Sequence, residues 1–367
     1  MDKKDRVLTT LDIEEPDRLP FMEMDIEMPL LEKITGEKFS GGTSFQTPVI
    51  SDRELEEKRV DLKIDAYRKL DFDMFVASLS APEEWELLER DDQTIVGPWG
   101  RVLKLDRGRN QWVPYSTVFE KPEDFYEFEF PEPEDQGWML ATEHAKERIQ
   151  DDMAIASFIR DPFAHAWEMF TPSKFVRWLY QKTDFIEDVI DRLTEHNVKL
   201  IDNLADAGAD LIISGGDYCE EKGPMVPNKY FEQIVFPNLE EQVKEANKNG
   251  LKFVKHTDGN VTPLLDDLSR IVDGVHSLDP SAGVDIGKVK EEYGQDLILF
   301  GNVSVDNLAN NSREEVVEET KNCIKRASPG GGHVLSSSNS WAAGAKLENC
   351  LAMIETAKEY GSYPIEL

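Results

Sequence analysis

The residues KHTDGN at positions 255–260 combine side chains that could bind a metal ion or move a proton. They follow the apolar run 251–254, and His256 and Asp258 stand two positions apart before Gly259. A short apolar run that ends in a His-x-Asp-Gly turn is typical of a buried strand with polar groups at its end. There the histidine can ligate a metal or carry a proton, and the aspartate can orient it or bind the same metal. The plainer alternative is an interior histidine and an aspartate in a turn hydrogen bond.

The same pattern recurs along the chain, because short apolar runs that end in polar residues alternate with helical stripes of apolar residues. The clearest helical stripes cover 184–207, 228–249, 312–326 and 347–360. Alternating strands and helices predict a parallel sheet of the α/β class, and eight such units predict a single (β/α)8 TIM barrel. The eight expected strands lie at 18–25, 72–79, 153–160, 210–217, 251–258, 274–279, 297–304 and 332–338.

Residues 81–137 interrupt this alternation. Turn signals at Gly97-Pro98 and Gly108 separate runs of period two, which predicts an antiparallel hairpin inserted after the second strand. An acidic, proline-rich segment follows, and we interpret its charges as solvated. We therefore expect one barrel domain over residues 1–367, with a hairpin insertion at about 81–137.

Reacting groups of such barrels collect at the carboxyl ends of the strands. Because a buried polar group is costly unless it is paired, the polar residues at these ends predict a polar cavity. Any one of them could instead cap a helix or form a turn. From the first strand to the eighth they are Glu23 and Asp25; Ser78 and Ser80; Arg160 and Asp161; Asp217, Cys219 and Glu220; His256 and Asp258; His276 and Asp279; Asn302; and Ser336, Ser337, Ser338 and Asn339.

The composition limits the partners. Lys and Arg total 41 against 73 Asp and Glu, a formal net charge of −32. This excess of acid opposes binding to nucleic acids and to anionic membrane surfaces. It fits either an acidic shell suited to high salt or ordinary solubility charge.

The cysteines and the N-terminal segment argue against several further classes of protein. The three cysteines lie far apart without a Cys-x-x-Cys pair, so neither a disulfide framework nor a zinc ribbon is indicated. The first residues are charged and lack the apolar core of a signal peptide, and no apolar run approaches the length of a membrane span. We expect a soluble, cytoplasmic protein. The helices of a barrel also offer surface for a homo-oligomer, although no distinct patch indicates one.

Four segments together resemble the uroporphyrinogen decarboxylase superfamily, which also contains cobalamin-dependent methyltransferases of anaerobic methyl metabolism. The resemblance spans about 15–365, is specific for the superfamily but not for a substrate, and implies the (β/α)8 barrel. The segments are GGDYCEEKGPMVPNKYFEQIVFPNLEEQVKEANKNGLKFVKHTDGNVTPLLDDL from 215, LFGNVS from 299, PGGGHVLSSSNS from 329 and LENCLAMIETAKEYGSYPI from 347.

Within this superfamily the residues favour the methyltransferase branch. The decarboxylase is expected to carry arginines after the first strand for its substrate carboxylates, whereas this chain has Glu23, Asp25 and Glu27 there. Methyltransferases of the branch that activate thiols use His-x-Cys and a second cysteine around zinc. Here Asp258 takes the place of the first cysteine, and serines end the last strand. The resemblance therefore puts methylation of a thiol in doubt.

Oxygen and nitrogen ligands suit a different leaving group. An ether oxygen leaves only if a Lewis acid or a proton donor stabilises its developing charge. We therefore predict a methyltransferase that moves a methyl group from a small O-methyl compound to the cob(I)alamin of a partner corrinoid protein. The corrinoid must come with the partner, because the chain has no Asp-x-His-x-x-Gly cobalamin motif.

The predicted acid or metal residues are His256, Asp258, Asp217 and Glu220, with zinc held by His256, Asp258 and Glu220 and with Cys219 as an alternative soft ligand. The predicted substrate-binding residues are Asn302, Ser337, Arg160, Asp25 and Trp341, with Phe21 and Trp167 as further aromatic walls. Such aromatic residues would equally suit a quaternary amine as methyl donor. Decarboxylation of a smaller acid and a non-catalytic ligand-binding barrel are the alternative functions.

Overall fold

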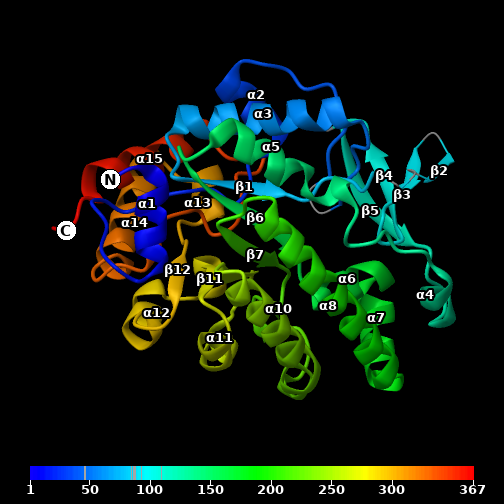
Figure 1. The fold of residues 1–367 in the computed structure, drawn as a ribbon. Helices are drawn as coiled ribbons and strands as arrows, with labels where there is room; N and C mark the ends of the chain where they lie inside the picture. The colour runs from blue at the N-terminus through cyan, green and yellow to red at the C-terminus, as the bar shows by residue number, and fades with distance from the viewer. Residues whose placement is uncertain (45–46, 84, 86–87, 92, 109) are drawn as a thin grey trace.

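The central element is a curled parallel sheet (Figure 1). The computed structural model describes the chain except for residues 45–46, 84, 86–87, 92 and 109. Within this described part the sheet has seven strands, in the order β1-β6-β7-β10-β11-β12-β13. They are β1 (Met74–Ser78), β6 (Ala154–Arg160), β7 (Leu211–Gly215), β10 (Lys252–Thr257), β11 (Gly274–Ser277), β12 (Ile298–Phe300) and β13 (His333–Val334). The predicted barrel-type α/β class is confirmed.

The predicted first strand at 18–25 is wrong as a regular strand, although this segment lies between the two edges of the sheet. Phe21 forms a parallel bridge to Leu335 just after β13, and its carbonyl accepts from the Asp73 N–H just before β1 at 3.1 Å. The ladder cannot continue, because Pro20 has no N–H and the Phe21 N–H donates to the Asp73 carboxylate at 3.0 Å. The eighth position of the barrel is thus filled by isolated bridges.

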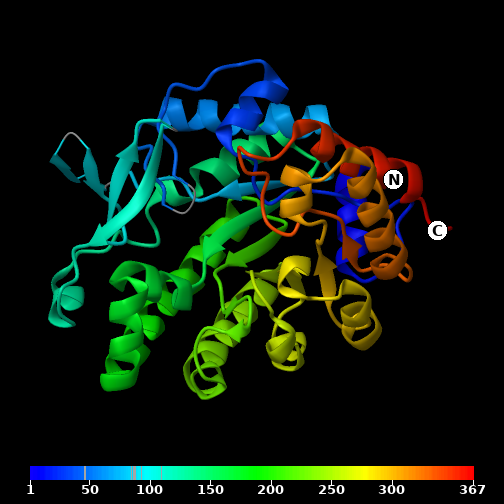
Figure 2. The same cartoon turned by 180° about the vertical axis from the view of Figure 1, so that it is seen from behind.

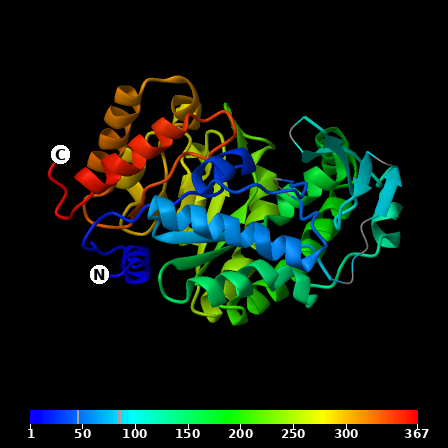
Figure 3. The same ribbon diagram turned by 90° about the horizontal axis from the view of Figure 1, so that it is seen from above.

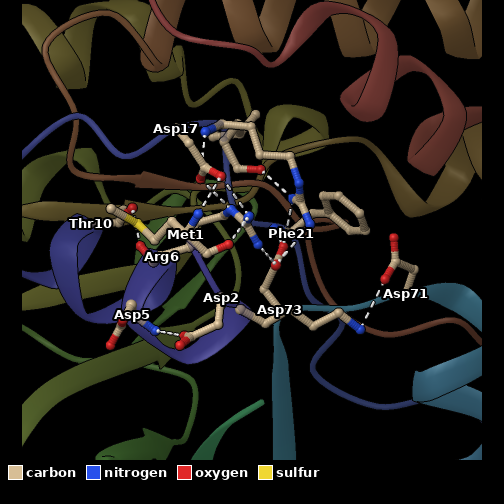
Figure 4. Close-up of polar contacts among 12 residues, drawn as sticks. Met1, Asp2, Asp5, Arg6, Thr10, Asp17, Phe21, Asp71 and Asp73 are labelled. Carbon is tan, nitrogen blue, oxygen red and sulfur yellow. Dashed lines mark hydrogen bonds and ion pairs between the residues drawn. The ribbon is translucent and has the colours of Figure 1, made fainter. Parts of the chain in front are cut away.

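Asp73 holds this closure together (Figure 4). Its side chain is fully buried and accepts from Arg6 Nη1 at 2.7 Å and from Arg18 Nη1 at 2.8 Å. Arg6 belongs to helix α1 (Lys3–Leu11), which packs against β1, β6 and β13. One carboxylate therefore joins the N-terminal helix, the bridging segment and the start of β1.

Alternation along the strands separates two cores. One set of side chains, including Val76, Ile213 and Val254, packs inside the curled sheet with Val7 and Leu11 of α1. The other set packs outward against the helices. Because side chains alternate along a strand, His256 shares the inner face with Val254 and extends it beyond the apolar layer.

Helices surround the sheet (Figures 1 and 2). The predicted helices at 184–207, 228–249, 312–326 and 347–360 are confirmed to within a residue or two, the second containing a π-helical turn at Phe231–Val235. The α-helices not yet given are α2 (Met28–Thr35), α3 (Arg53–Leu70), α5 (Leu140–Ile149), α6 (Pro162–Phe170), α7 (Pro172–Gln181), α8 (Thr183–Asp206), α9 (Asn228–Tyr230), α10 (Phe236–Lys248), α11 (Leu265–Ile271), α12 (Ile286–Tyr293), α13 (Val305–Asn310), α14 (Arg313–Ala327) and α15 (Leu347–Tyr360), and the 3₁₀ turns are Gln136–Met139, Thr262–Leu264 and Pro280–Ala282.

The insertion after β1 is antiparallel, as predicted, and larger than one hairpin. Its described residues form a four-stranded sheet of β2 (Leu88–Asp91), β3 (Thr94–Val96), β4 (Arg101–Asp106) and β5 (Gln111–Thr117), followed by the short helix α4 (Glu123–Glu127). This sheet lies at one end of the molecule, and the two chain ends lie together at the other (Figures 1 and 3). Across the described part of the chain, the helices are all too short or too polar to cross a membrane.

Candidate functional site

Three predicted residues meet where β7 and β10 end. The parallel register sets His256 beside Gly215, so Asp217, two residues after β7, comes close to His256 and to Asp258. One ligand atom of each residue lies within 4.8 Å of the other two. The Asp258 N–H donates to Asp217 Oδ1 at 3.1 Å, and His256 Nε2 lies 3.9 Å from Asp258 Oδ1. We call these three residues the triad.

Asp258 is held by the last residue of β11 and by a residue of the segment that follows β13. Ser277 Oγ, at the end of β11, donates to its Oδ1 at 2.8 Å, and Asn339 Nδ2 donates to its Oδ2. The turn after it needs glycine, because Gly259 has φ +78° and a Cβ there would lie 2.6 Å from the Glu220 carbonyl oxygen. Burial, followed by the charge of Asp217, raises the Asp258 pKa to about 7, so this carboxyl holds a proton for part of the time at neutral pH.

The histidine of the triad is neutral near pH 7. Burial lowers the His256 pKa to about 4, although the charge of Asp217 acts in the opposite direction. Its Nδ1 lies 2.7 Å from Nδ1 of His276, the residue opposite it on β11. Burial also lowers the His276 pKa well below its usual value. The two imidazoles therefore form a neutral, hydrogen-bonded pair.

The residues of the triad fit a divalent metal ion. Two carboxylates in close contact repel each other when both are ionised, and a bound cation would remove that repulsion. Imidazole and carboxylate are ligands that zinc and other transition metals accept. Cys219 is buried, and among the described residues it does not belong to this cluster of ligand atoms.

The third member of the triad is Asp217, whereas the zinc prediction placed Glu220 there. Glu220 lies in the two-residue strand β8 (Cys219–Glu220), which pairs with β9 (Gly223–Pro224), and it is exposed to solvent. Among the described residues it does not belong to the cluster of ligand atoms. The Glu220 carbonyl accepts from the Asn260 N–H at 3.0 Å, so the hairpin backbone packs against the turn after Asp258 while the Glu220 side chain faces solvent.

A cavity of about 510 Å³ lies at the carboxyl ends of β1 and β6, and its wall does not include the three residues of the triad. Asp25 and Arg160, both predicted to bind substrate, line it together with Phe158 and with Trp99 of the insertion. Arg160 is the last residue of β6, and the parallel register sets it beside Gly215 of β7, two residues before Asp217. The cavity wall and the triad therefore lie at the ends of neighbouring strands.

The charged groups of the cavity wall are paired. Lys63 Nζ is buried 2.7 Å from Asp25 Oδ1, and Arg160 makes two contacts with the Glu168 carboxylate. His165 also lines the cavity, and its Nδ1 is buried with no hydrogen-bond partner among the described residues. The wall therefore offers both charged and neutral groups to a small molecule.

The other predicted substrate residues serve as internal supports. Asn302 Nδ2 donates to the Leu278 carbonyl at 2.8 Å, and Ser337 Oγ donates to Glu23 at 2.8 Å. Trp341 is fully buried with its ring 5.8 Å from that of Phe72. A substrate-binding role for these three residues stays a prediction.

Sequence reasoning missed the partners of the triad. His276 and Asn339 were recognised as polar residues at strand ends, but not as contacts of His256 and Asp258. Parallel strands end at the same edge of the sheet, so residues at the same distance from the ends of neighbouring strands are expected to lie side by side. This rule is a sequence signal for such contacts. Ser277 could have been found in the same way.

Glu23 provides a pH-dependent stability prediction. It is fully buried, and burial raises its pKa to about 8 against the hydrogen bonds that it accepts from Ser337. Between the unfolded pKa near 4.3 and about 8, the folded state therefore binds more protons than the unfolded state. The free energy of unfolding should fall as pH rises through this window, by on the order of 3 kcal/mol from this residue.

Urea unfolding of the parent chain and of Glu23→Gln at pH 5 and pH 8 tests this. The glutamine variant should lose less stability than the parent between the two pH values. An equal loss in both proteins would show that Glu23 is ionised in the folded state.

Comparison with known proteins places this fold and site in a family. The family model described as uroporphyrinogen decarboxylase (URO-D) matches residues 100–360, more than half of the chain. Over 216 residues the chain is 26% identical to the methylcobamide:CoM methyltransferase MtaA of Methanosarcina barkeri, which covers 59% of this chain and 61% of that protein. The chain thus matches less than two thirds of the length of this curated relative.

Solved structures agree with the fold. A methyltransferase from Methanosarcina mazei has a TM-score of 0.74 at 21% identity and covers 98% of this chain and 99% of its own. The B12-independent methionine synthase from Shewanella sp. W3-18-1 has a TM-score of 0.50 at 11% identity, over 87% of this chain and 96% of its own. At these identities the likeness shows the fold alone. The predicted resemblance to this superfamily is confirmed by the family match, and the curated relative is a corrinoid-linked methyltransferase: the chain belongs to the uroporphyrinogen decarboxylase family.

Proposed function

We propose that this chain is a methyltransferase that moves a methyl group from a small O-methyl compound to the cob(I)alamin of a partner corrinoid protein. The observation that carries the proposal is the triad, in which two carboxylates and an imidazole converge at the carboxyl ends of β7 and β10, on the same edge of the sheet as a cavity of about 510 Å³. The name of the curated relative, a methylcobamide:CoM methyltransferase, supports corrinoid-linked methyl transfer. The oxygen-rich triad supports a donor whose leaving atom is oxygen.

In this reaction the bond between the methyl carbon and the oxygen breaks, and the oxygen keeps the bonding pair. The methyl carbon bonds to cobalt, which passes from Co(I) to Co(III), and the oxygen takes up one proton. Asp258 suits the delivery of that proton, because its pKa of about 7 lies near the working pH. Asp217, Ser277 and Asn339 hold Asp258 at the carboxyl edge of the sheet.

A zinc ion would be held by His256 Nε2 and by one oxygen each of Asp217 and Asp258. When bound, it would act as a Lewis acid toward an oxygen that acquires negative charge. The protein residues would then orient the donor, with Asp25 and Arg160 as polar contacts and Trp99 and Phe158 as apolar walls. A quaternary amine is the alternative donor, because acidic residues and aromatic rings both line this cavity.

The first experiment measures the anaerobic loss of cob(I)alamin absorbance with a panel of methoxylated aromatics, small methyl ethers and methylamines. We expect methylcobalamin with an O-methyl donor and loss of that activity in His256→Ala. The matched control is His144→Ala, because His144 lies on α5 in contact with Asp61, outside the triad.

Methylcobalamin from a methylamine alone would overturn the O-methyl assignment and favour the amine donor. No methylcobalamin with any donor, also in the presence of a corrinoid protein, would overturn the methyltransferase proposal. The decarboxylase and ligand-binding alternatives would then be tested by release of CO2 from small acids.

A further inference from the structure

A continuous chain of buried hydrogen bonds leads from the triad to the opposite side of the barrel mouth. His256 Nδ1 and His276 Nδ1 are 2.7 Å apart, and His276 Nε2 lies 3.1 Å from Ser336 Oγ. Ser336 Oγ donates to the Ser337 carbonyl at 2.7 Å. His276 and Ser336 are both fully buried, so water does not compete for these bonds.

Counting donors and acceptors along this chain determines which ring nitrogens carry protons. The single proton of Ser336 points at the Ser337 carbonyl, so its oxygen is left to accept from His276 Nε2–H. This geometry places the proton of His276 on Nε2.

The state of His256 follows from that of His276. A neutral imidazole carries one N–H, so His276 Nδ1 has a free lone pair and can only accept. His256 must then donate from Nδ1, and its Nε2 is left without a proton. This Nε2 faces Asp258, with 3.9 Å between it and Oδ1.

We infer that His276 is a positioning residue, which together with Ser336 holds His256 as the Nδ1–H tautomer and so presents the Nε2 lone pair to the triad. The tautomer rests on hydrogen-bond geometry alone, and its use for metal binding rests on the proposed function. Histidine ligands of metals commonly donate their other N–H to a fixed acceptor. Here the acceptor is a second histidine.

The chain of bonds orients His256 and does not conduct protons away from it. It ends at the Ser337 carbonyl, which accepts hydrogen bonds and has no proton to pass on. The lone pair on His256 Nε2 is therefore maintained while a proton is exchanged elsewhere in the site.

The direct test is long-range ¹H–¹⁵N NMR of the metal-free protein labelled with ¹⁵N-histidine, in which the two tautomers give distinct nitrogen shifts. Signals are assigned by replacing each of the six histidines singly. We expect an Nδ1–H signal for His256 and an Nε2–H signal for His276. The reverse pattern would overturn the inference, whether or not the protein transfers methyl groups.

Calorimetric titration with Zn²⁺ tests the consequence. His276→Leu should weaken binding by about 10- to 100-fold. His276→Asn should restore most of the affinity, because its amide oxygen stands close to the position of His276 Nδ1. The matched control is His333→Leu, which removes an equally buried histidine bonded to Ser328 and to the Gly301 carbonyl.

Circular dichroism checks that each variant is folded. Equal zinc affinity of His276→Leu and the parent chain would overturn the positioning role. If the parent binds no Zn²⁺, the proposed metal site fails, and the NMR pattern alone decides on the tautomer.

Discussion

Replacement of Asp258 by asparagine is expected to lower the rate of methyl transfer to cob(I)alamin by about 10³-fold, the upper part of the range for loss of a proton donor or electrostatic stabiliser. Asparagine keeps the size of the side chain and removes both its proton and its charge. The fold should tolerate the change, because burial and Asp217 already disfavour the ionised form of Asp258. Loss of activity would then report chemistry and not unfolding.

The matched control is Glu220→Gln, which also exchanges a carboxylate for an amide, at an exposed position directly before the turn at 221–222. Its rate should stay within about twofold of the parent. The measurement is the initial rate of methylcobalamin formation at saturating donor, with the unfolding temperature recorded for both variants. Equal losses in the two variants would contradict the assignment of the triad. A loss confined to Glu220→Gln would restore Glu220 as the third member of the site.

Replacement of Asp73 by asparagine should lower the free energy of unfolding by about 3–5 kcal/mol. The Asp73 carboxylate is fully buried between Arg6 and Arg18, and it also accepts from the Phe21 N–H (Figure 4). Without the Asp73 charge, the guanidinium groups of Arg6 and Arg18 lose their common anionic partner in a largely buried site. The bridging segment and α1 should loosen together.

Asp71 provides an internal comparison for this prediction. Like Asp73 it contacts two cations, Lys3 and Lys358, but its side chain is 45% exposed. Asparagine also tolerates its positive φ of 63°. Because exposed ion pairs contribute little, Asp71→Asn should cost about 1 kcal/mol or less.

Urea denaturation followed by circular dichroism, with calorimetry as a second probe, measures both variants. Similar losses for Asp71→Asn and Asp73→Asn would show that burial of the carboxylate does not decide the cost. The closure of the barrel by Asp73 would then be of minor energetic importance.

Much of the fold was predictable from local patterns. Apolar runs of strand length and helical stripes are set by neighbours in the sequence, so the helices at 184–207 and 347–360 were placed within a residue of their observed bounds. The first strand was not placed correctly, because Pro20 has no N–H and the Phe21 N–H donates to the Asp73 carboxylate, so two hydrogen bonds of the expected ladder are missing. Phe21 and Asp73 are 52 positions apart in the sequence, so local patterns do not show their contact.

The site was predictable to a similar degree. The order of strands in a barrel brings the residues after each strand to one edge, and this alone united Asp217, His256 and Asp258. The sequence did not show that Glu220 turns outward, because that depends on the hairpin of β8 and β9. Nor did it show that Trp341 is buried against Phe72 and that Asn302 bonds to Leu278.

The sequence by itself therefore determined the barrel class, the resemblance to the family and the kinds of side chain at its mouth. These properties follow from periodicity and residue type, which each segment carries independently. Only the tertiary structure decided which of those side chains touch, including the pair of His256 and His276 and the support of Asp258 by Asn339. Such contacts depend on strand register and on the face to which each side chain points, and a shift of one residue in either would separate them.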